Sequence, residues 1–302
     1  MVPDIPTLMA ALRAEHAGQG NAAFGIATAG PSQTQDRFRQ WIDRGIPPGI
    51  DYLKRHIPLR ADPDTLLSGV RSILAIAAPY PVNPDPAAGI STYARCRDYH
   101  DILRARLRRF ARIIEQHDPG TKCRTCVDSA PLAEREWALR AGLGWRGRQG
   151  HLVTASGCSV VLGFLLTRTV LPPTGTIPDQ CGTCTRCRDA CPTQAIGRDG
   201  LINPSRCISY LTIEHSGDIP ESFHTAIGRR LFGCDCCTAS CPWNRQSDHP
   251  PSHDFAFREM PSAHDLLAMD DTTFKARYAD TPLIRAGLKR LQRNAAIVIR
   301  NT

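Results

Sequence analysis

A cysteine-rich stretch between residues 181 and 241 constrains the fold of this chain more than any other feature. Its first half has the spacing C-x-x-C-x-x-C-x-x-x-C-P, in which three thiolates bind one [4Fe–4S] cluster and the fourth binds a second. Two-residue gaps let a tight turn aim successive sulfurs at one cube, and the proline ends the turn. The second half, which ends at Cys241-Pro242, lacks one thiolate, and Cys207 supplies it. The sequence therefore predicts two clusters, one bound by Cys181, Cys184, Cys187 and Cys241, the other by Cys191, Cys207, Cys234 and Cys237.

Zinc sites and a disulfide framework are the alternatives for so many cysteines. Zinc usually takes two CxxC pairs, whereas here three cysteines follow one another at two-residue gaps and then CP. The chain has 13 cysteines, and its N-terminus has neither a basic region nor an apolar stretch that would act as a signal peptide. We therefore expect a reducing cytoplasm and metal binding rather than disulfides.

The bulk composition limits the class of protein and of partner. A chain of 302 residues with 42% hydrophobic residues has room for one large or two smaller domains. It has no apolar run of about 18 residues, so no membrane span is expected. The net charge of +8 favours a polyanionic partner, RNA above all, although solubility alone also accounts for it.

Hydrophobic periodicity predicts helices and strands that alternate along the first half of the chain. Helices are expected over 5–17, 37–44, 98–116 and 132–141, and strands over 22–28, 72–80, 151–154 and 160–167. This alternation predicts a mixed α/β or α+β class. The expected domains are an α/β domain over 1–175, a ferredoxin-like two-cluster domain over 176–250, and a short helical segment over 251–302. The glycine-rich stretch 142–148 is expected to be a loop, and it lacks the signature of a nucleotide fold.

Asp128 is the carboxylate that stands out from the sequence itself. The residues before the clusters are more than an electron carrier needs, which predicts a second redox centre or a substrate site. Asp128 follows a buried strand at the point where it opens into a loop, the usual place for a functional residue. The alternative is that Asp128 or Ser129 caps the next helix, with Glu134 nearby.

Several segments together resemble the tRNA epoxyqueuosine reductases, which use cobalamin and iron–sulfur clusters. The most specific are the stretch between the cysteine runs, Cys207-Ile-Ser-Tyr-Leu-Thr-Ile-Glu214, and Cys241-Pro-Trp-Asn244. The other matching segments are Arg60–Pro63, Asp98–Asp101, Val127–Pro131, Arg140–Trp145, Cys181–Ile196 and Gly233–Asn244. The resemblance implies that the first domain holds cobalamin next to one cluster, without a protein ligand below the cobalt, and that the clusters supply electrons singly.

The resemblance also implies roles for single residues. Asp128 matches the family's proton donor, whose pKa we expect a desolvated pocket to raise. Arg135 matches a substrate-side position near the active site. The positions that match the cobalamin pocket are Arg55, Tyr99, Asp128, Gln149, His151 and Thr154. The implied partners are a tRNA with epoxyqueuosine in its anticodon loop and an external electron donor of the flavodoxin or ferredoxin type. We expect a cytoplasmic monomer.

The chain departs from the family pattern at a few places. Arg148-Gln149 stands where Lys-Asn is commoner, and Cys236 makes the second run Cys-Asp-Cys-Cys. We expect Cys237 to be the ligand, because it keeps the three-residue gap to Cys241. Cys123 and Cys126 form an extra CxxC, for which we expect a structural role. Many members continue with helical repeats that help to bind tRNA; this chain ends at Thr302, so those repeats are expected to be truncated or absent.

Three other functions remain possible at this stage. A corrinoid reductive dehalogenase shares the clusters and cobalamin but usually has an export signal. A pure electron-transfer protein would bind iron but no cobalamin. A tRNA-binding module with vestigial chemistry is the third, and the complete cysteine set argues against it.

Overall fold

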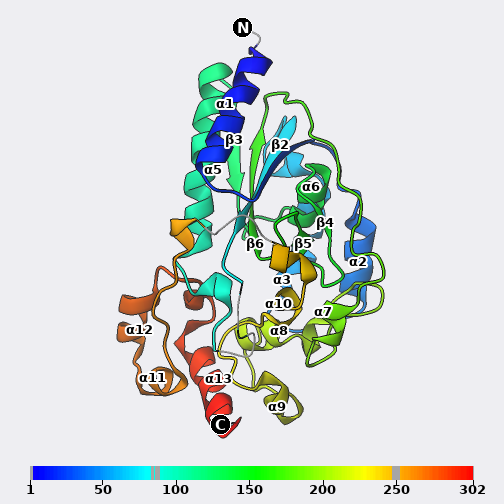
Figure 1. Ribbon diagram of the computed structural model, residues 1–302. Coiled ribbons are helices and arrows are strands. Elements are labelled where there is room, and N and C mark those ends of the chain that lie inside the picture. Colours follow the sequence, from blue (N-terminus) through cyan, green and yellow to red (C-terminus); the bar gives the residue numbers. More distant parts are fainter. Residues whose placement is uncertain (1–2, 83–84, 86–88, 247–251, 302) are drawn as a thin grey trace.

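The computed structural model describes residues 3–82, 85, 89–246 and 252–301. A four-stranded sheet of order β1-β2-β6-β3 lies at its centre, and all three strand pairings are antiparallel (Figure 1). The strands are β1 (Ala23–Thr28), β2 (Ser72–Pro79), β3 (Cys123–Cys126) and β6 (Val160–Thr167). The expected mixed class is confirmed, and the antiparallel pairing makes the sheet one of the α+β kind.

Helices cover both faces of this sheet. Every residue of β2 is buried, which explains the unbroken apolar run in the sequence. Leu74 and Ile76 pack under α1 (Ile5–Gly18) and α5 (Tyr99–His117), which lie side by side in Figure 1. The alternate residues of the strand face α6 (Glu134–Arg140), whose fully buried Trp137 lies in the second core. Asp98 caps α5, so this helix begins and ends within one residue of its expected limits.

A small hairpin lies beside α6. The strand expected over 151–154 is reduced to β5 (Leu152–Val153), and it pairs with β4 (Trp145–Arg146). The expectation of a loop over 142–148 is therefore wrong at β4. The glycine at position 144 explains the pairing, because a Cβ there would lie 1.9 Å from the Val153 carbonyl oxygen and would push the two strands apart.

Short helices carry the cysteines, and three further helices follow them. The helices between β1 and β2 are α2 (Gln35–Asp43), α3 (Tyr52–Arg55) and α4 (Ile57–Ala61). The helices of the cysteine-bearing segment are α7 (Arg186–Asp189), α8 (Ile208–Ile213), α9 (His224–Ile227) and α10 (Cys236–Ala239). The three that follow are α11 (Ala263–Ala268), α12 (Asp271–Tyr278) and α13 (Gly287–Asn301). The helical character expected for the C-terminal segment is confirmed. The domain limits stay a prediction, and the one expected at 250 and 251 lies outside the described residues.

The three expected units pack against one another. Ile297 of α13 shares a core with Ile208 of α8 and with Ile50, just before α3. A second shared core joins α11–α13 to Ile90 and Phe232, which form a parallel bridge. The C-terminal helices therefore lie below the sheet and against the cysteine-bearing segment (Figure 1). Across the described part of the chain, no helix combines the length and apolar character needed to cross a membrane.

Candidate active site

Asp128 lies two residues after the end of β3, in a turn held by its neighbour Glu134. Its φ of 45° is in the left-handed region, which is strained for a residue with a side chain. Its backbone N–H donates a hydrogen bond to Glu134 Oε1 at 2.6 Å, and this contact stabilises the turn. The Asp128 side chain remains 45% exposed. The turn thus presents the carboxylate to an open site.

His100 and Tyr99 begin α5 beside this carboxylate. Asp98 Oδ1 accepts the backbone N–H of His100 and lies 2.7 Å from its Nδ1. The other ring nitrogen, Nε2, lies 3.4 Å from Asp128 Oδ2. The Tyr99 ring stacks on the His100 ring with centroids 4.2 Å apart, and its hydroxyl lies close enough to Asp128 to hydrogen-bond. The start of one helix therefore supplies two groups that hold protons beside Asp128.

The pKa of Asp128 is lower than its ordinary value. Burial raises it, but the hydrogen bond and charge of His100 and the charge of Arg285, 3.8 Å from Oδ2, outweigh burial. The expected raised pKa is therefore wrong for this structure, because two cations face one carboxylate oxygen. Burial lowers the pKa of His100, yet its hydrogen bonds to Asp128 and Asp98 prevail and raise it to about 9. At neutral pH the proton shared by this pair resides on His100.

Glu134 is a second carboxyl group with an altered pKa. Burial raises the pKa of Glu134 to about 8, the charge of Asp128 adds to this, and the N–H of Asp128 opposes it. The charges of Arg135 and Arg60 also act on Glu134. Burial, together with the charge of Arg135, lowers the pKa of His151 to about 4, so its imidazole is neutral. Arg135 is exposed but faces the same space as Glu134 and His151, and its role stays a prediction.

The other residues expected at the cobalamin pocket lie in different surroundings. Gln149 is buried, and within the described residues its Nε2 makes no hydrogen bond of good geometry, although the side chain lies close enough to the Cys158 thiol to affect its pKa. Thr154 is buried, and its hydroxyl donates to a carbonyl three residues further along the chain. Arg55 is 74% exposed, with Asp51 at 4.0 Å. The roles of Arg55, Gln149, His151 and Thr154 stay predictions.

Sequence reasoning missed three neighbours of Asp128. His100 belongs to the segment Asp98–Asp101 that supports the resemblance, so its position in the sequence was a usable signal. Arg285 and Tyr52 gave no such signal, because they come from η7 (Pro282–Arg285) and α3, far from Asp128 in the chain. Tyr52 is hydrogen-bonded to Arg285 and lies within the electrostatic field of Asp128. The site is therefore assembled from four parts of the chain.

The cysteines expected to bind clusters lie in two adjacent groups. Electrostatic neighbours within the first group are Cys181, Cys184, Cys187 and Cys241, and those within the second are Cys191, Cys207 and Cys237. Cys187 also acts on Cys237, so the groups are close together. The division of these cysteines into two sets of cluster ligands stays a prediction. Cys234, the eighth, lies next to Cys236.

The geometry also separates Cys236 from Cys237. The Arg230 side chain is buried and donates from Nη2 to Cys236 Sγ at 2.8 Å. The Cys237 thiol instead lies among the second group of cysteines. This supports the expectation that Cys237 is the ligand.

The extra CxxC of β3 does not form a joint site. Cys123 packs against the core on the α1 and α5 side of the sheet, whereas Cys126 packs in the core on the α6 side. Residues three apart on a strand point to opposite faces. The structural role expected for this pair is in accord with that placement.

Two residues of the Cys241-Pro-Trp-Asn244 segment join the cysteine-bearing unit to the first domain. The ring of Trp243 packs edge-on against that of Trp145, with centroids 4.7 Å apart, beside Cys181 and Cys241. The Oδ1 atom of Asn244 accepts the backbone N–H of Cys158 at 2.7 Å. These contacts fix the first cysteine group against the turn that leads into β6.

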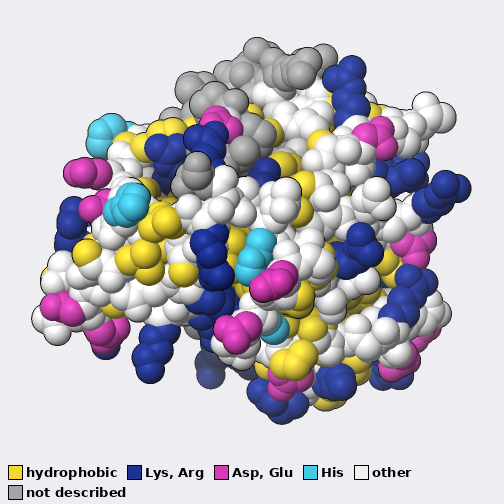
Figure 2. Space-filling model, turned by 90° about the horizontal axis from the view of Figure 1, so that it is seen from below, with side chains coloured by type: hydrophobic (Ala, Val, Ile, Leu, Met, Phe, Trp, Pro, Cys, Tyr) yellow, Lys and Arg dark blue, Asp and Glu magenta, His cyan; other side chains and the backbone are white. Residues whose placement is uncertain are grey.

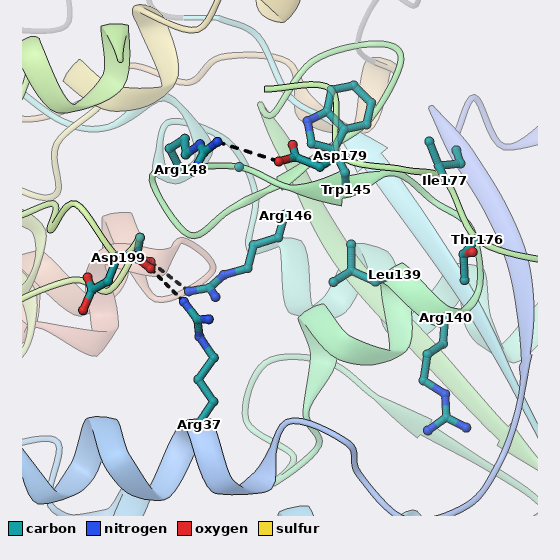
Figure 3. A pocket seen from close by; sticks show the side chains of 12 residues that line it. Arg37, Leu139, Arg140, Trp145, Arg146, Arg148, Thr176, Ile177, Asp179 and Asp199 are labelled. Atoms are coloured by element: carbon teal, nitrogen blue, oxygen red, sulfur yellow. Dashed lines mark hydrogen bonds and ion pairs between the residues drawn. The ribbon is translucent and has the colours of Figure 1, made fainter. Parts of the chain in front are cut away.

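A basic cavity of about 430 Å³ lies beside the tryptophan loop, which is the glycine-rich stretch 142–148 with Trp145 and β4 (Figure 3). Four arginines line it, and each donates to a protein carbonyl: Arg37 to Asp199, Arg140 to Pro31 and Thr28, Arg146 to Gly200, and Arg148 to Gly182. These hydrogen bonds hold α2 and the tryptophan loop to the cysteine-bearing unit. We therefore interpret this cavity as a junction between segments.

Comparisons with known proteins agree with this geometry. The family model described as "4Fe-4S double cluster binding domain" matches residues 180–244. The model described as "Epoxyqueuosine reductase QueG, DUF1730" matches residues 60–129, which include Tyr99, His100 and Asp128. The epoxyqueuosine reductase of Aliivibrio fischeri is 37% identical over 298 residues, which cover 93% of this chain and 80% of that protein. The chain belongs to the epoxyqueuosine reductase family.

Other members support the assignment. The epoxyqueuosine reductase of Escherichia coli is 36% identical over 93% of this chain and 78% of its own length. A crystal structure of epoxyqueuosine reductase with an epoxyqueuosine-modified tRNA-Tyr stem loop has a TM-score of 0.89 and 30% identity, and covers 99% of this chain and 82% of that one. The Streptococcus thermophilus structure also has a TM-score of 0.89, at 28% identity, and covers 97% and 81% of the two chains. The family uses two [4Fe–4S] clusters and cobalamin.

Proposed function

We propose that this chain reduces epoxyqueuosine to queuosine at the wobble position of tRNA. The observation that carries the proposal is the open Asp128 carboxylate, 3.4 Å from a His100 imidazole that holds a proton at neutral pH. It lies in the chain of a family whose members are named for this reaction. Membership of that family favours this function over a dehalogenase or a pure electron carrier.

The reaction removes one oxygen atom from the substrate. Both carbon–oxygen bonds of the epoxide break, a carbon–carbon double bond forms, and the oxygen leaves as water. The balance requires two electrons and two protons. When bound, the clusters and cobalamin supply the electrons one at a time. The protein itself must deliver a proton to the departing oxygen, because an alkoxide is a poor leaving group in a desolvated site.

The residues around Asp128 have separable tasks in this scheme. Asp128 faces the substrate and delivers the proton, and His100 supplies it through the Nε2–Oδ2 contact. Glu134 keeps the strained turn in place through the backbone of Asp128. Tyr99 limits the movement of the imidazole by stacking on it. Arg135, on the exposed start of α6, is placed to contact the tRNA.

The residues present fit the implied cofactors. The two adjacent groups of cysteines match the preference of iron–sulfur clusters for thiolate ligands. The buried amide of Gln149 and the neutral His151 offer polar groups beside the tryptophan loop to a large cofactor with amide side chains. We assign Gln149, His151, Thr154, Tyr99 and Arg55 to cobalamin, with the cysteines Cys181, Cys184, Cys187, Cys241, Cys191, Cys207, Cys234 and Cys237 as cluster ligands.

The partners follow from the charge and the chemistry. A net charge of +8 attracts the phosphates of tRNA, and Figure 2 shows Lys and Arg side chains spread over the face that includes the C-terminal helices. A base in the single-stranded anticodon loop is accessible to an enzyme pocket. We also propose an external electron donor of the flavodoxin or ferredoxin type, a monomeric state and a cytoplasmic location.

The proposed function is tested with anaerobically reconstituted protein. The first step is a visible spectrum and metal count after addition of iron, sulfide and cobalamin, for which we expect about eight irons and about one cobalt. The second is single turnover of an epoxyqueuosine-containing tRNA stem loop by the native protein and by Asp128→Asn. Queuosine formation that Asp128→Asn lowers at least tenfold supports the proposal. A fully loaded native protein that leaves the epoxide unchanged overturns it.

A further inference from the structure

Arg285 connects the C-terminal helical segment to the candidate active site. It ends the short turn η7, directly before α13. Its Nε donates to Glu214 Oε1 at 2.7 Å, and its Nη1 lies 3.8 Å from Asp128 Oδ2. Glu214 follows α8, so this guanidinium links the cysteine-bearing unit, the C-terminal segment and the first domain.

The backbone of Arg285 is fixed, whereas its side chain is accessible. The neighbouring Leu283 and Ala286 are buried in the core that α11–α13 form. The Arg285 side chain is 42% exposed, and that of Glu214 is 22% exposed. The guanidinium also donates a hydrogen bond to the hydroxyl oxygen of Tyr52 of α3. An incoming anionic ligand can therefore reach the guanidinium while its backbone stays in place.

Arg285 and His100 share one oxygen of Asp128. Oδ2 lies 3.4 Å from His100 Nε2 and 3.8 Å from Arg285 Nη1. Opposite charges at such distances attract each other, and solvent weakens this attraction for exposed groups. The other titratable groups on which Asp128 acts are Tyr52, Tyr93, Tyr99 and Glu134. Asp98 faces His100, Glu214 faces Arg285, and Arg104 of α5 donates to the hydroxyl of Ser129, the next residue after Asp128. Of these two arginines, Arg285 makes the ion pair with Asp128, at 3.8 Å.

We propose that Arg285 is a positioning residue that pairs with Asp128 in the free enzyme and releases it when a tRNA phosphate draws the guanidinium away. Release raises the proton affinity of the Asp128 carboxylate, so that transfer of one proton from His100 Nε2 to Asp128 Oδ2 becomes less unfavourable. In this transfer an imidazolium and a carboxylate become a neutral imidazole and a carboxylic acid, and no electrons move. The polyanionic substrate thereby makes Asp128 a better acceptor of the His100 proton as it binds. This inference rests on the proposed function.

A direct test observes the carboxylic acid by infrared difference spectroscopy on the cofactor-loaded protein. The probe is an unmodified tRNA anticodon stem loop, which binds without reacting. When the native protein is titrated with acid, we expect a carboxylic acid band whose pH midpoint rises by about one unit on addition of this RNA, and this band should be missing in Asp128→Asn. In Arg285→Gln, the midpoint should already be raised by about one unit without RNA. Arg285→Lys should restore part of the native behaviour.

Lys289→Gln is the matched control. Lys289 is an exposed cation of the same segment, and its substitution by glutamine removes one positive charge from the same region. It should behave like the native protein in the infrared experiment. An Arg285→Gln spectrum like that of the native protein, with and without RNA, overturns the inference. So does an Arg285→Gln variant whose only defect is a raised KM for tRNA with an unchanged pH profile, which marks a phosphate contact alone.

Failure of this inference can be told apart from failure of the proposed function. If the bands behave as expected but the loaded native protein does not convert epoxyqueuosine, the proposed function is wrong and the role proposed for Arg285 is retained. If turnover occurs but Arg285→Gln shows native bands and a native pH profile, the role proposed for Arg285 is wrong and the proposed function is retained.

Discussion

His100 Nε2 lies 3.4 Å from Asp128 Oδ2, while Asp98 holds the other ring nitrogen of His100 at 2.7 Å. The imidazole therefore lies between two carboxylates, and this position raises its pKa to about 9. Asp128 is the exposed member of the three, with 45% of its side chain accessible, whereas the His100 side chain is 16% exposed. A proton stored on the protected imidazole can thus be delivered through the accessible carboxyl group.

The first prediction concerns the pH dependence of turnover. The His100–Asp128 pair loses its proton as pH rises through about 9, so single-turnover rates should fall above that pH. His100→Asn should lower the rate on the order of 10- to 100-fold at neutral pH and remove this inflection. His117→Asn, at the far end of the same helix, is the control. A native rate that stays constant up to pH 10 would contradict the role assigned to His100.

The same residue predicts a pH dependence of stability. The pKa of His100 is raised in the folded state above its ordinary value near 6.5. Its stabilising effect is therefore fully present below about pH 6.5 and is lost as pH rises through about 9. The difference in unfolding free energy between the native protein and His100→Asn should shrink by roughly 2–3 kcal/mol across this window. Urea unfolding at several pH values measures it, and a difference that does not vary with pH would refute this account.

Glu134 should respond differently to two substitutions. Its folded-state pKa of about 8 lies above the ordinary value near 4.5, so its stability contribution is present below about 4.5 and lost as pH rises through 8. Glu134→Gln keeps an oxygen that accepts the Asp128 N–H but cannot ionise, and it should be more stable than the native protein at pH 9 by roughly 1–3 kcal/mol. Glu134→Ala removes the acceptor and should lower turnover at least tenfold. Equal turnover in the two variants would show that Glu134 does not hold the turn.

The two adjacent cysteines Cys236 and Cys237 offer a matched pair. Cys237→Ser removes a proposed ligand and should reduce bound iron from about eight to about four per chain. Cys236→Ser should retain about eight irons, because its thiol faces Arg230. Iron analysis and electron paramagnetic resonance of the reduced protein measure both. Loss of a cluster in Cys236→Ser alone would reverse the assignment.

The elements of the first domain could be predicted because their signals are local. The unbroken apolar run of β2 and the periodicity of α5 depend on residues close together in the chain, and both elements lie within one or two residues of the expected limits. The hairpin β4–β5 could not be predicted in the same way. Its first strand has only two residues, and the close approach to Val153 that requires a glycine at 144 is a tertiary contact.

The same distinction between local signals and tertiary contacts applies to the active site. Asp128 could be singled out because a strand, a turn and a helix start follow one another in the sequence around it. The lowered pKa of Asp128 could not, because it depends on His100 and on Arg285, and only tertiary packing brings these two residues within 3.4 and 3.8 Å of its carboxylate. Arg106 of α5 shows the same effect, since it is buried in an ion pair with Asp254 at 2.7 Å, a partner far away in the sequence.

The last prediction tests the junction that Asn244 forms. Its Oδ1 accepts the backbone N–H groups of Cys158 and Ser159, at 2.7 and 3.2 Å, and its Nδ2 donates to the Thr238 carbonyl at 2.6 Å. Asn244→Ala leaves these buried groups without partners and should lower the free energy of unfolding by roughly 2–5 kcal/mol.

Asn244→Asp separates the two halves of this junction, because a carboxylate still accepts both N–H groups but cannot donate to Thr238. It should therefore lie between the native protein and Asn244→Ala in stability. Both variants should also lose iron from the cluster that Cys241 binds sooner than the native protein does under a chelator, since Asn244 fixes the chain just after this cysteine. Anaerobic urea unfolding and chelator-dependent bleaching of the visible spectrum measure the two effects. If Asn244→Ala unfolds and bleaches like the native protein, the contact does not hold the cluster-bearing unit against the first domain.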